Sequence, residues 1–273
     1  MDRNELPPEV RQLAELGDPW ELNELIDYRE KGIGPQHVDA LLDVVRNTVE
    51  IWESVDPQQE SPEEWFPLHA WRALAQLQAL DAMPTLLDTL NLIEKLDSDL
   101  VQEEMPEVFA KMGPAALPNL EAFVLDTGKE MWARLAAAEG MQIIATDHNE
   151  TRDQVVGTIV RALEGYERED PTFNGFMINF LLDLRAIEAA PAVEKVYQAN
   201  QVDLSILGDG EDFQVGIGLL EKRITPIGWL PGGDGWGNET ARVNGQKEDT
   251  KTKKKRKQAK ASRQKNRKKK KKK

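Results

Sequence analysis

The chain has 273 residues, 40% of them hydrophobic and none of them cysteine. It can therefore bury a sizeable core, but it cannot form disulfides or a thiolate metal site. The N-terminal sequence MDRNELPPEV lacks the apolar core of a signal peptide, and no apolar run approaches the roughly 18 residues of a membrane span. We therefore expect a cytoplasmic protein without a membrane segment.

Charge is divided unevenly along the chain. The formal net charge is −13, but residues 247–273 hold 17 basic and two acidic residues, a net charge of +15, and the remainder carries −28. A lysine-rich segment of this kind repels itself and has no apolar surface to bury. The sequence thus predicts an acidic folded body followed by a disordered basic tail over 247–273.

Residues 1–65 read as an N-terminal helical cap ahead of any repeat. A first helix follows two prolines and stops at Gly17, and Asp18-Pro19 is a suitable cap for a second helix, which would run to Gly32. Gly34-Pro35 opens a third helix, with apolar residues at spacings of three and four as far as Trp52.

A helix–turn–helix sequence pattern occurs twice in the chain. The stretch LAQLQALDAMPTLLDTL at 74–90 matches LLDLRAIEAAPAVEKVY at 181–197 when Pro84 is aligned with Pro191. The matched pairs are Leu74/Leu181, Leu77/Leu184, Leu80/Ile187, Asp81/Glu188, Ala82/Ala189, Leu86/Val193 and Leu90/Tyr197. Because one such unit cannot bury its apolar face alone, repeated units stack as a solenoid. The alternative is an ordinary helical bundle with chance similarity.

Four helix pairs follow from this pattern. Their expected ranges are 63–78 with 82–96, 99–112 with 114–126, 131–145 with 151–166, and 173–184 with 188–199. Pro118 stands 34 residues after Pro84, and Pro191 follows after two further steps of about 36 residues. A proline suits the first turn of a helix, where its missing N–H costs little. We assign 66–224 to the repeat region, with a short capping helix after residue 200.

The stretches 74–90, 181–197 and MGPAALPNLEAF at 112–123 resemble the PBS-lyase-type HEAT-like repeat proteins, a bacterial α-solenoid family. The resemblance covers roughly 66–200 and implies an all-α, right-handed solenoid that binds another macromolecule. Some members of the family attach bilins to cysteines, but no residue of this chain matches that activity. Other members end in a cysteine-rich zinc motif, which this chain lacks. We therefore expect no enzymatic activity, no cofactor and no metal.

Isolated motifs give little sign of catalysis. His37, His69 and His148 are far apart and form no HExxH motif, and His69 lies near two tryptophans, which favours a packing role. The sequence from Asp170 imitates an EF-hand loop, but Leu181 stands where the bidentate glutamate is needed. Asp170 is better interpreted as a helix cap.

Two acidic clusters are candidate binding residues. They comprise Glu103 and Glu104, and Asp209, Glu211 and Asp212. Neither cluster has a base, nucleophile or metal partner in the sequence, so a solvated surface is the favoured interpretation. The alternative is a ridge that binds a basic partner.

Residues 225–246 form a linker rich in glycine and proline that carries Trp229 and Trp236. Large apolar residues in such a segment often dock on a surface. Two interpretations stand equal: the linker folds back onto the last helices, or it is a short motif that binds a partner.

The basic tail is the strongest functional feature outside the repeats. Its KKKRK motif comprises Lys253, Lys254, Lys255, Arg256 and Lys257, which also spell a nuclear import signal for a eukaryotic host. Many cations without an aromatic residue indicate nonspecific, salt-sensitive phosphate contacts, as with RNA or a ribosome. The alternatives are a solubility tail, or a tail that folds onto the acidic body.

The repeats and the tail lead to two functional hypotheses. The first is a non-catalytic α-solenoid scaffold for protein–protein interaction, whose partner the sequence does not name. The second is an RNA- or ribosome-associated protein that uses the tail. An acidic body of 46 acids and 18 bases argues against duplex DNA lying along the repeats.

Overall fold

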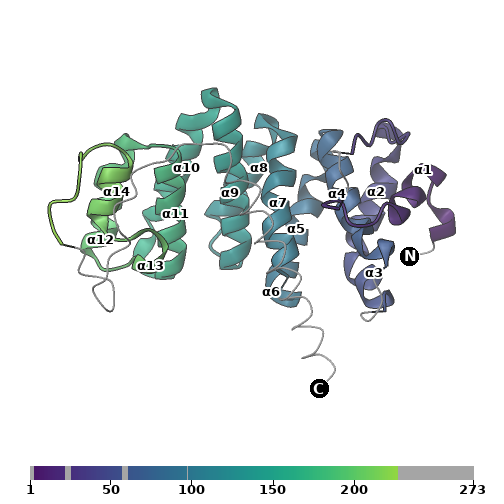
Figure 1. The fold of residues 1–273 in the computed structure, drawn as a ribbon, viewed down its shortest axis with the longest axis horizontal. Coiled ribbons are helices and arrows are strands. Elements are labelled where there is room, and N and C mark those ends of the chain that lie inside the picture. The colour runs from purple at the N-terminus through teal and green to yellow at the C-terminus, as the bar shows by residue number, and fades with distance from the viewer. Residues whose placement is uncertain (1–2, 22–25, 57–60, 97, 227–273) are drawn as a thin grey trace, which may run out of the picture. The chain divides into compact units, whose positions relative to one another are not determined.

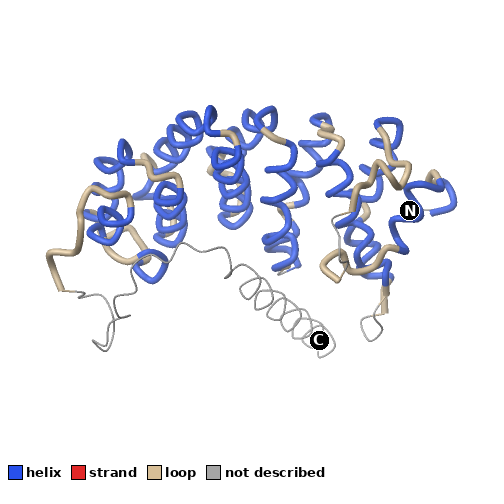
Figure 2. Tube along the Cα trace, turned by 45° about the horizontal axis from the view of Figure 1, so that its top comes forward, coloured by secondary structure: helices blue, strands red, loops and turns tan. Residues whose placement is uncertain are grey.

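The computed structural model describes residues 3–21, 26–56, 61–96 and 98–226, and these residues are helical with no β-strand among them (Figures 1 and 2). The chain divides into two compact units with the boundary between Thr151 and Arg152. This boundary falls inside the predicted repeat region, between a hairpin turn and the helix that follows it.

The first unit consists of α-helices and short 3-10 helices (η). They are η1 (Arg3–Glu5), α1 (Pro8–Arg11), η2 (Gln12–Glu15), η3 (Pro35–His37), α2 (Val38–Arg46), α3 (Thr48–Ser54), η4 (Pro62–Trp65), α4 (Phe66–Gln76), η5 (Leu80–Ala82), α5 (Met83–Thr89), α6 (Leu92–Leu96), α7 (Asp99–Met112), η6 (Pro114–Ala116), α8 (Leu117–Leu125), α9 (Met131–Asp147) and η7 (Asn149–Thr151).

The second unit has the same character. Its elements are α10 (Arg152–Leu163), η8 (Tyr166–Arg168), α11 (Pro171–Asp183), η9 (Ile187–Ala189), α12 (Ala190–Gln198), α13 (Leu204–Leu207) and α14 (Gly210–Gly216). The four predicted helix pairs begin and end within a few residues of the ranges expected from the sequence. The predicted helical content of this region is therefore confirmed.

A common turn joins the helices of three predicted pairs. A three-residue 3-10 helix ends on a buried alanine, and a proline then occupies the second position of the next helix. The alanines are Ala82, Ala116 and Ala189, and the prolines are Pro84, Pro118 and Pro191. A proline here loses no intrahelical hydrogen bond. The predicted role of the prolines as markers of the second helix is confirmed.

The ends of α4 and α11 are built alike. Gln78 and Arg185 both have positive φ, 51° and 50°, and the next amide reaches back to the carbonyls of Leu74 and Leu181, at 3.1 and 2.9 Å. This is the Schellman arrangement that closes a helix. Gln78 aligns with Arg185 and Leu74 with Leu181 in the sequence match, so the two hairpins share backbone geometry here even where the residue type differs.

The matched apolar positions are mostly core positions. Leu74, Leu86 and Leu181 are fully buried, and Val193 is 1% exposed. The most exposed of these apolar positions is the first residue of the turn, where Leu80 and Ile187 are 39% and 49% exposed. The repeat pattern therefore fixes packing inside each hairpin and leaves one aliphatic side chain of each turn at the surface.

Helices α7 and α9 pack closely because α9 has a glycine at the crossing. An added Cβ at Gly140 would lie 3.0 Å from the Cβ of Phe109 and 3.3 Å from the carbonyl oxygen of Pro106. Pro106 lies inside α7, which continues through it. Gly140 thus permits the closest approach between these two helices.

Three predictions about helices need correction. The expected second helix through Trp20 is not a helix in the described residues, because 19–21 and 28–32 form turns. Its residues are held by distant partners instead: the amide of Tyr28 donates to Gln76, and the rings of Trp20 and Trp65 make an edge-to-face contact with their centroids 5.4 Å apart. The expected helix 82–96 divides into α5 and α6, and at the end of α5 the hydroxyl of Thr89 donates to the carbonyl of Thr85 at 3.1 Å. The third expected helix, which runs to Trp52, likewise divides into α2 and α3.

Candidate functional site

The C-terminal acidic cluster begins as a helix cap. Asp209 precedes α14, and its Oδ1 accepts hydrogen bonds from the amides of Glu211 and Asp212 at 3.0 and 3.2 Å. The Asp212 carboxylate accepts in return from the Asp209 amide at 3.0 Å, which completes a capping box. The sequence DGED is thus arranged by the ordinary chemistry of a helix start.

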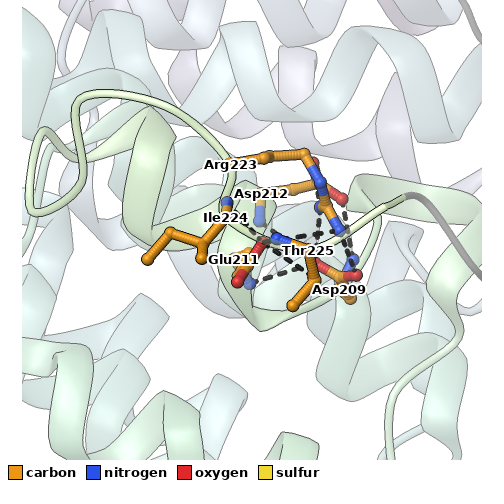
Figure 3. A network of polar contacts seen from close by, with 6 residues as sticks. All are labelled: Asp209, Glu211, Asp212, Arg223, Ile224 and Thr225. Atoms are coloured by element: carbon orange, nitrogen blue, oxygen red, sulfur yellow. Dashed lines mark hydrogen bonds and ion pairs between the residues drawn. The ribbon is translucent and has the colours of Figure 1, made fainter.

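Arg223, which follows α14 in the chain, binds this cluster and neutralises part of its negative charge. Its guanidinium donates to both oxygens of Asp209 at 2.7 Å and lies 2.6 Å from Asp212 Oδ1 (Figure 3). These bonds hold the pKa of Asp209 below its ordinary value. A bidentate arginine–carboxylate pair is among the stronger polar contacts of proteins.

Glu211 extends the same network to the end of the described chain. Its Oε2 accepts from the amides of Ile224 and Thr225 at 3.2 and 3.0 Å, and from the Thr225 hydroxyl at 2.9 Å (Figure 3). These bonds, with the amide of Thr225 first, hold the pKa of Glu211 below its ordinary value. The cluster therefore fastens residues 223–225 onto the start of α14.

The other acidic pair is divided between the surface and the interior. Glu103 is exposed on α7, whereas Glu104 is 5% exposed and accepts from Arg72 of α4 through both carboxylate oxygens, one bond measuring 2.9 Å. Neighbours in a helix point about 100° apart, so one of the two meets α4. The prediction of a solvated surface is wrong for Glu104.

The two acidic clusters belong to different units of the chain: Glu103 and Glu104 to the first, and Asp209, Glu211 and Asp212 to the second. The hypothesis that they form one ridge for a basic partner stays a prediction.

The first unit contains a buried polar and aromatic network that the sequence did not indicate. The hydroxyl of Tyr28 lies 2.9 Å from His69 Nδ1, and His69 Nε2 lies 2.9 Å from the carbonyl of Gly17. A carbonyl only accepts, so Nε2 carries the proton and the neutral ring accepts the Tyr28 hydroxyl at Nδ1. Nearby, the Arg72 guanidinium lies over the ring of Trp20 at 5.4 Å from its centroid.

Burial sets the protonation of this network. Desolvation lowers the pKa of His69 to about 4, against the opposing effect of the Gly17 carbonyl, and desolvation also raises the pKa of Tyr28. Tyr28 is 3% exposed and His69 is fully buried, so neither side chain can meet a substrate. The network joins the loop segments around Gly17 and Tyr28 to α4, which agrees with the packing role predicted for His69.

The remaining sequence motifs have local explanations. Asp170 caps α11 by accepting from the Thr172 amide at 2.7 Å, so the cap interpretation is confirmed. His37 accepts from the Gly34 amide at 3.1 Å, and His148 lies 3.6 Å from Glu150. Within the residues that the structure describes, no three His, Asp or Glu side chains are grouped to hold a metal ion.

Several predicted residues lie outside the described part of the chain. They are Trp229 and Trp236 of the linker, and Lys253, Lys254, Lys255, Arg256 and Lys257 of the tail.

Comparison with known proteins adds no relative. No family model, curated protein or solved structure matches this chain. Among the helices of the described ranges, none is both long enough and apolar enough to cross a bilayer.

Proposed function

We propose that this protein is a right-handed α-solenoid of HEAT-like hairpins, of the PBS-lyase-type family that its repeats resemble, and that it serves as a non-catalytic scaffold for binding another protein. The observation that carries this proposal is the repeated hairpin turn, with its 3-10 helix, buried alanine and second-position proline. Units with one geometry and an apolar face stack side by side, and stacked units present a long surface to a partner.

The chemistry of the described residues supports a scaffold better than an enzyme. The polar groups described above already have partners within their own unit: His69 with Tyr28, Glu104 with Arg72, and Asp209 with Arg223. Catalysis needs a group that is both activated and accessible to substrate. A bilin-type lyase activity finds no supporting residue.

The charge of the body indicates the kind of protein that it would bind. Residues 1–246 hold 46 acids and 18 bases, and Glu103 places one of these carboxylates on the exposed side of α7. A surface of this sign accelerates association with a basic partner and disfavours an acidic one. A partner with a basic surface is therefore the class to test first, in the cytoplasm as the expected compartment.

The tail supports a second candidate function. Seventeen basic residues over 247–273 can displace counterions from a phosphate backbone, as on RNA or a ribosome. Affinity of this origin falls steeply with salt. The body would then be carried to the ribosome or RNA by its tail.

One set of measurements separates the two functions. RNA and ribosome co-sedimentation is compared at low and high salt for the full chain, for residues 1–245, and for a full chain with Lys253–Lys257 replaced by glutamine. The tail function predicts association that the truncation abolishes, that the glutamine variant weakens and that high salt removes. Equal association of the truncation, or none by any form, would contradict it.

The scaffold function is tested on the same proteins by affinity capture from cell extract. The scaffold proposal predicts that the full chain and residues 1–245 retain the same protein, and that Glu103→Lys weakens its retention through charge reversal on α7. The matched control is Glu164→Lys, an exposed carboxylate of the second unit that keeps the net charge of the variant equal. Capture only by forms that carry the tail would overturn the scaffold proposal.

A further inference from the structure

Helices α12 and α14 of the second unit leave a hollow between them of about 290 Å³. Val193 and Phe213, each 1% exposed, lie at its base, and the ring of Tyr197 forms a wall beside Gly210. The rim is polar and is formed by Glu194, Gln198, Glu211 and Gln214. Ligand pockets begin at about 300 Å³, so the hollow has room for one large side chain.

The chain itself leads an apolar segment to this hollow. Glu211 lines the hollow and also holds the backbone of Thr225, so the described chain is fixed at the rim shortly before it ends (Figure 3). The sequence that follows Thr225 is PIGWLP, with Trp229 four residues further on. Four residues span at most about 14 Å, so an indole attached there remains within reach of the hollow.

We propose that the side chain of Trp229 occupies the hollow between α12 and α14, so that residues 226–230 fold back over the end of the second unit. An aromatic ring matches the ring of Tyr197 and the apolar base, and an indole N–H needs an acceptor at its edge, which the rim carboxylate of Glu194 supplies. Trp236 lies seven residues further on, beyond the GGDG sequence, and is not part of this contact.

Docking of Trp229 decides between the two interpretations of the linker for this residue. The linker is anchored within its own chain, and the basic residues of 247–273 then leave from a fixed point on the second unit. A bound Trp229 also closes the hollow to aromatic side chains of other proteins. This proposal is independent of the proposed function, since it concerns only the second unit and the segment next to it.

The test uses the full chain with 5-fluorotryptophan at its seven tryptophans, read by fluorine NMR. The variants Trp229→Ala and Trp236→Ala assign the two linker signals by their loss. With a soluble paramagnetic reagent, we expect the Trp229 signal to be broadened several-fold less than that of Trp236. Equal broadening of the two signals would overturn the proposal.

A pair of glycine substitutions locates the site. Gly210→Gln places a side chain in the hollow, because a Cβ there lies 3.5 Å from the Tyr197 ring, and we expect Trp229 to become as accessible as Trp236. Gly157→Gln is the matched control, since a Cβ at this position of α10 meets nothing within 4 Å, and it leaves Trp229 protected. Protection that survives Gly210→Gln, or that disappears on dilution as expected for docking between two copies, would overturn the proposal.

A second measurement leaves the helices unaltered, in case Gly210→Gln fails to fold. The chain has three tyrosines, and 3-fluorotyrosine gives a separate signal for Tyr197, assigned by Tyr197→Phe. Trp229→Ala removes an adjacent ring and shifts this signal, whereas Trp236→Ala leaves it in place. A Tyr197 signal that neither variant moves would contradict docking in the hollow.

Discussion

At the scale of single residues, the first unit depends on one neutral histidine. The ring of His69 donates to Gly17 and accepts from Tyr28, which requires that it carry a single proton. A second proton would remove the acceptor of the Tyr28 hydroxyl and place a charge among buried aromatic rings. Acid should therefore loosen this part of the fold.

The first prediction is that unfolding free energy falls as the pH drops below about 6.5. The unfolded chain binds a proton at His69 near pH 6.5, but the folded chain does so only near pH 4. The unfolded state therefore holds more protons in this window, and stability rises with pH across it. Between pH 7 and pH 5 the loss from His69 is about 2 kcal/mol as an upper limit, measured by urea unfolding.

The control for this pH dependence is His69→Gln, which keeps a hydrogen-bonding side chain but cannot titrate. This variant is expected to be less stable at pH 7 and to lose less stability on acidification. If the variant and the natural chain lose equal amounts between pH 7 and pH 5, His69 is not the group responsible.

The sequence predicted residue roles where local chemistry decides them. The cap by Asp170 and the second-helix prolines could be recognised because a cap or a first turn involves only nearby backbone. The partners of His69 and Glu104 could not, since Tyr28 and Arg72 are 41 and 32 residues away from them. No spacing rule selects a distant partner, and for the same reason the pairing of Asp209 with Arg223 was missed.

At the scale of helices, the hairpins follow from apolar spacing and from breaks that contain proline or glycine. Helix α7 begins and ends where the sequence places it, between Ser98 and Gly113. The helix predicted around Trp20 is absent from the described residues, because the edge-to-face contact with Trp65 and the hydrogen bond from Tyr28 to Gln76 outweigh a weak helical preference. Short segments with few local contacts are the ones that tertiary packing reshapes.

The second prediction compares two glycines within helices. Gly140→Ala should destabilise the protein by about 1–3 kcal/mol, because its methyl group would press on Phe109 and on the carbonyl of Pro106. Gly157→Ala, on the exposed side of α10 with nothing within 4 Å, should stabilise it by about 0.5–1 kcal/mol. Denaturant midpoints measure both changes.

The opposite signs are the informative part of this comparison, because the two substitutions are chemically the same. If both alanines stabilise the protein, α7 and α9 are not in close contact at Gly140. If both alanines destabilise the protein, the space around Gly157 is not open, contrary to the structure.

At the scale of the whole molecule, acidic residues are concentrated toward the N-terminus. Residues 1–151 hold 31 acids and 10 bases, whereas residues 152–246 hold 15 acids and eight bases. A basic partner should therefore prefer the first unit, which places Glu103 ahead of the Arg223 cluster as a binding candidate. At the Arg223 cluster, a basic partner would have to replace a guanidinium that is already bound to Asp209.

The solenoid is the central claim, and it makes equivalent turns fall at regular intervals. In the proposed solenoid, Leu80 and Ile187 begin equivalent turns three repeats apart, and both side chains are exposed. Packed helices lie roughly 8–10 Å apart, so three steps in one solenoid separate these turns by roughly 25–30 Å. The sequence suggests this order, but it contains no signal for how one hairpin packs on the next.

The most direct test is the distance between spin labels on Leu80→Cys and Ile187→Cys in the same chain. The natural chain has no cysteine, so only these two sites are labelled. We predict a single narrow distance distribution centred at roughly 25–35 Å, allowing for the label arms. A broad distribution, or one centred beyond about 45 Å, would show that the hairpins do not form one continuous stack and would contradict the solenoid.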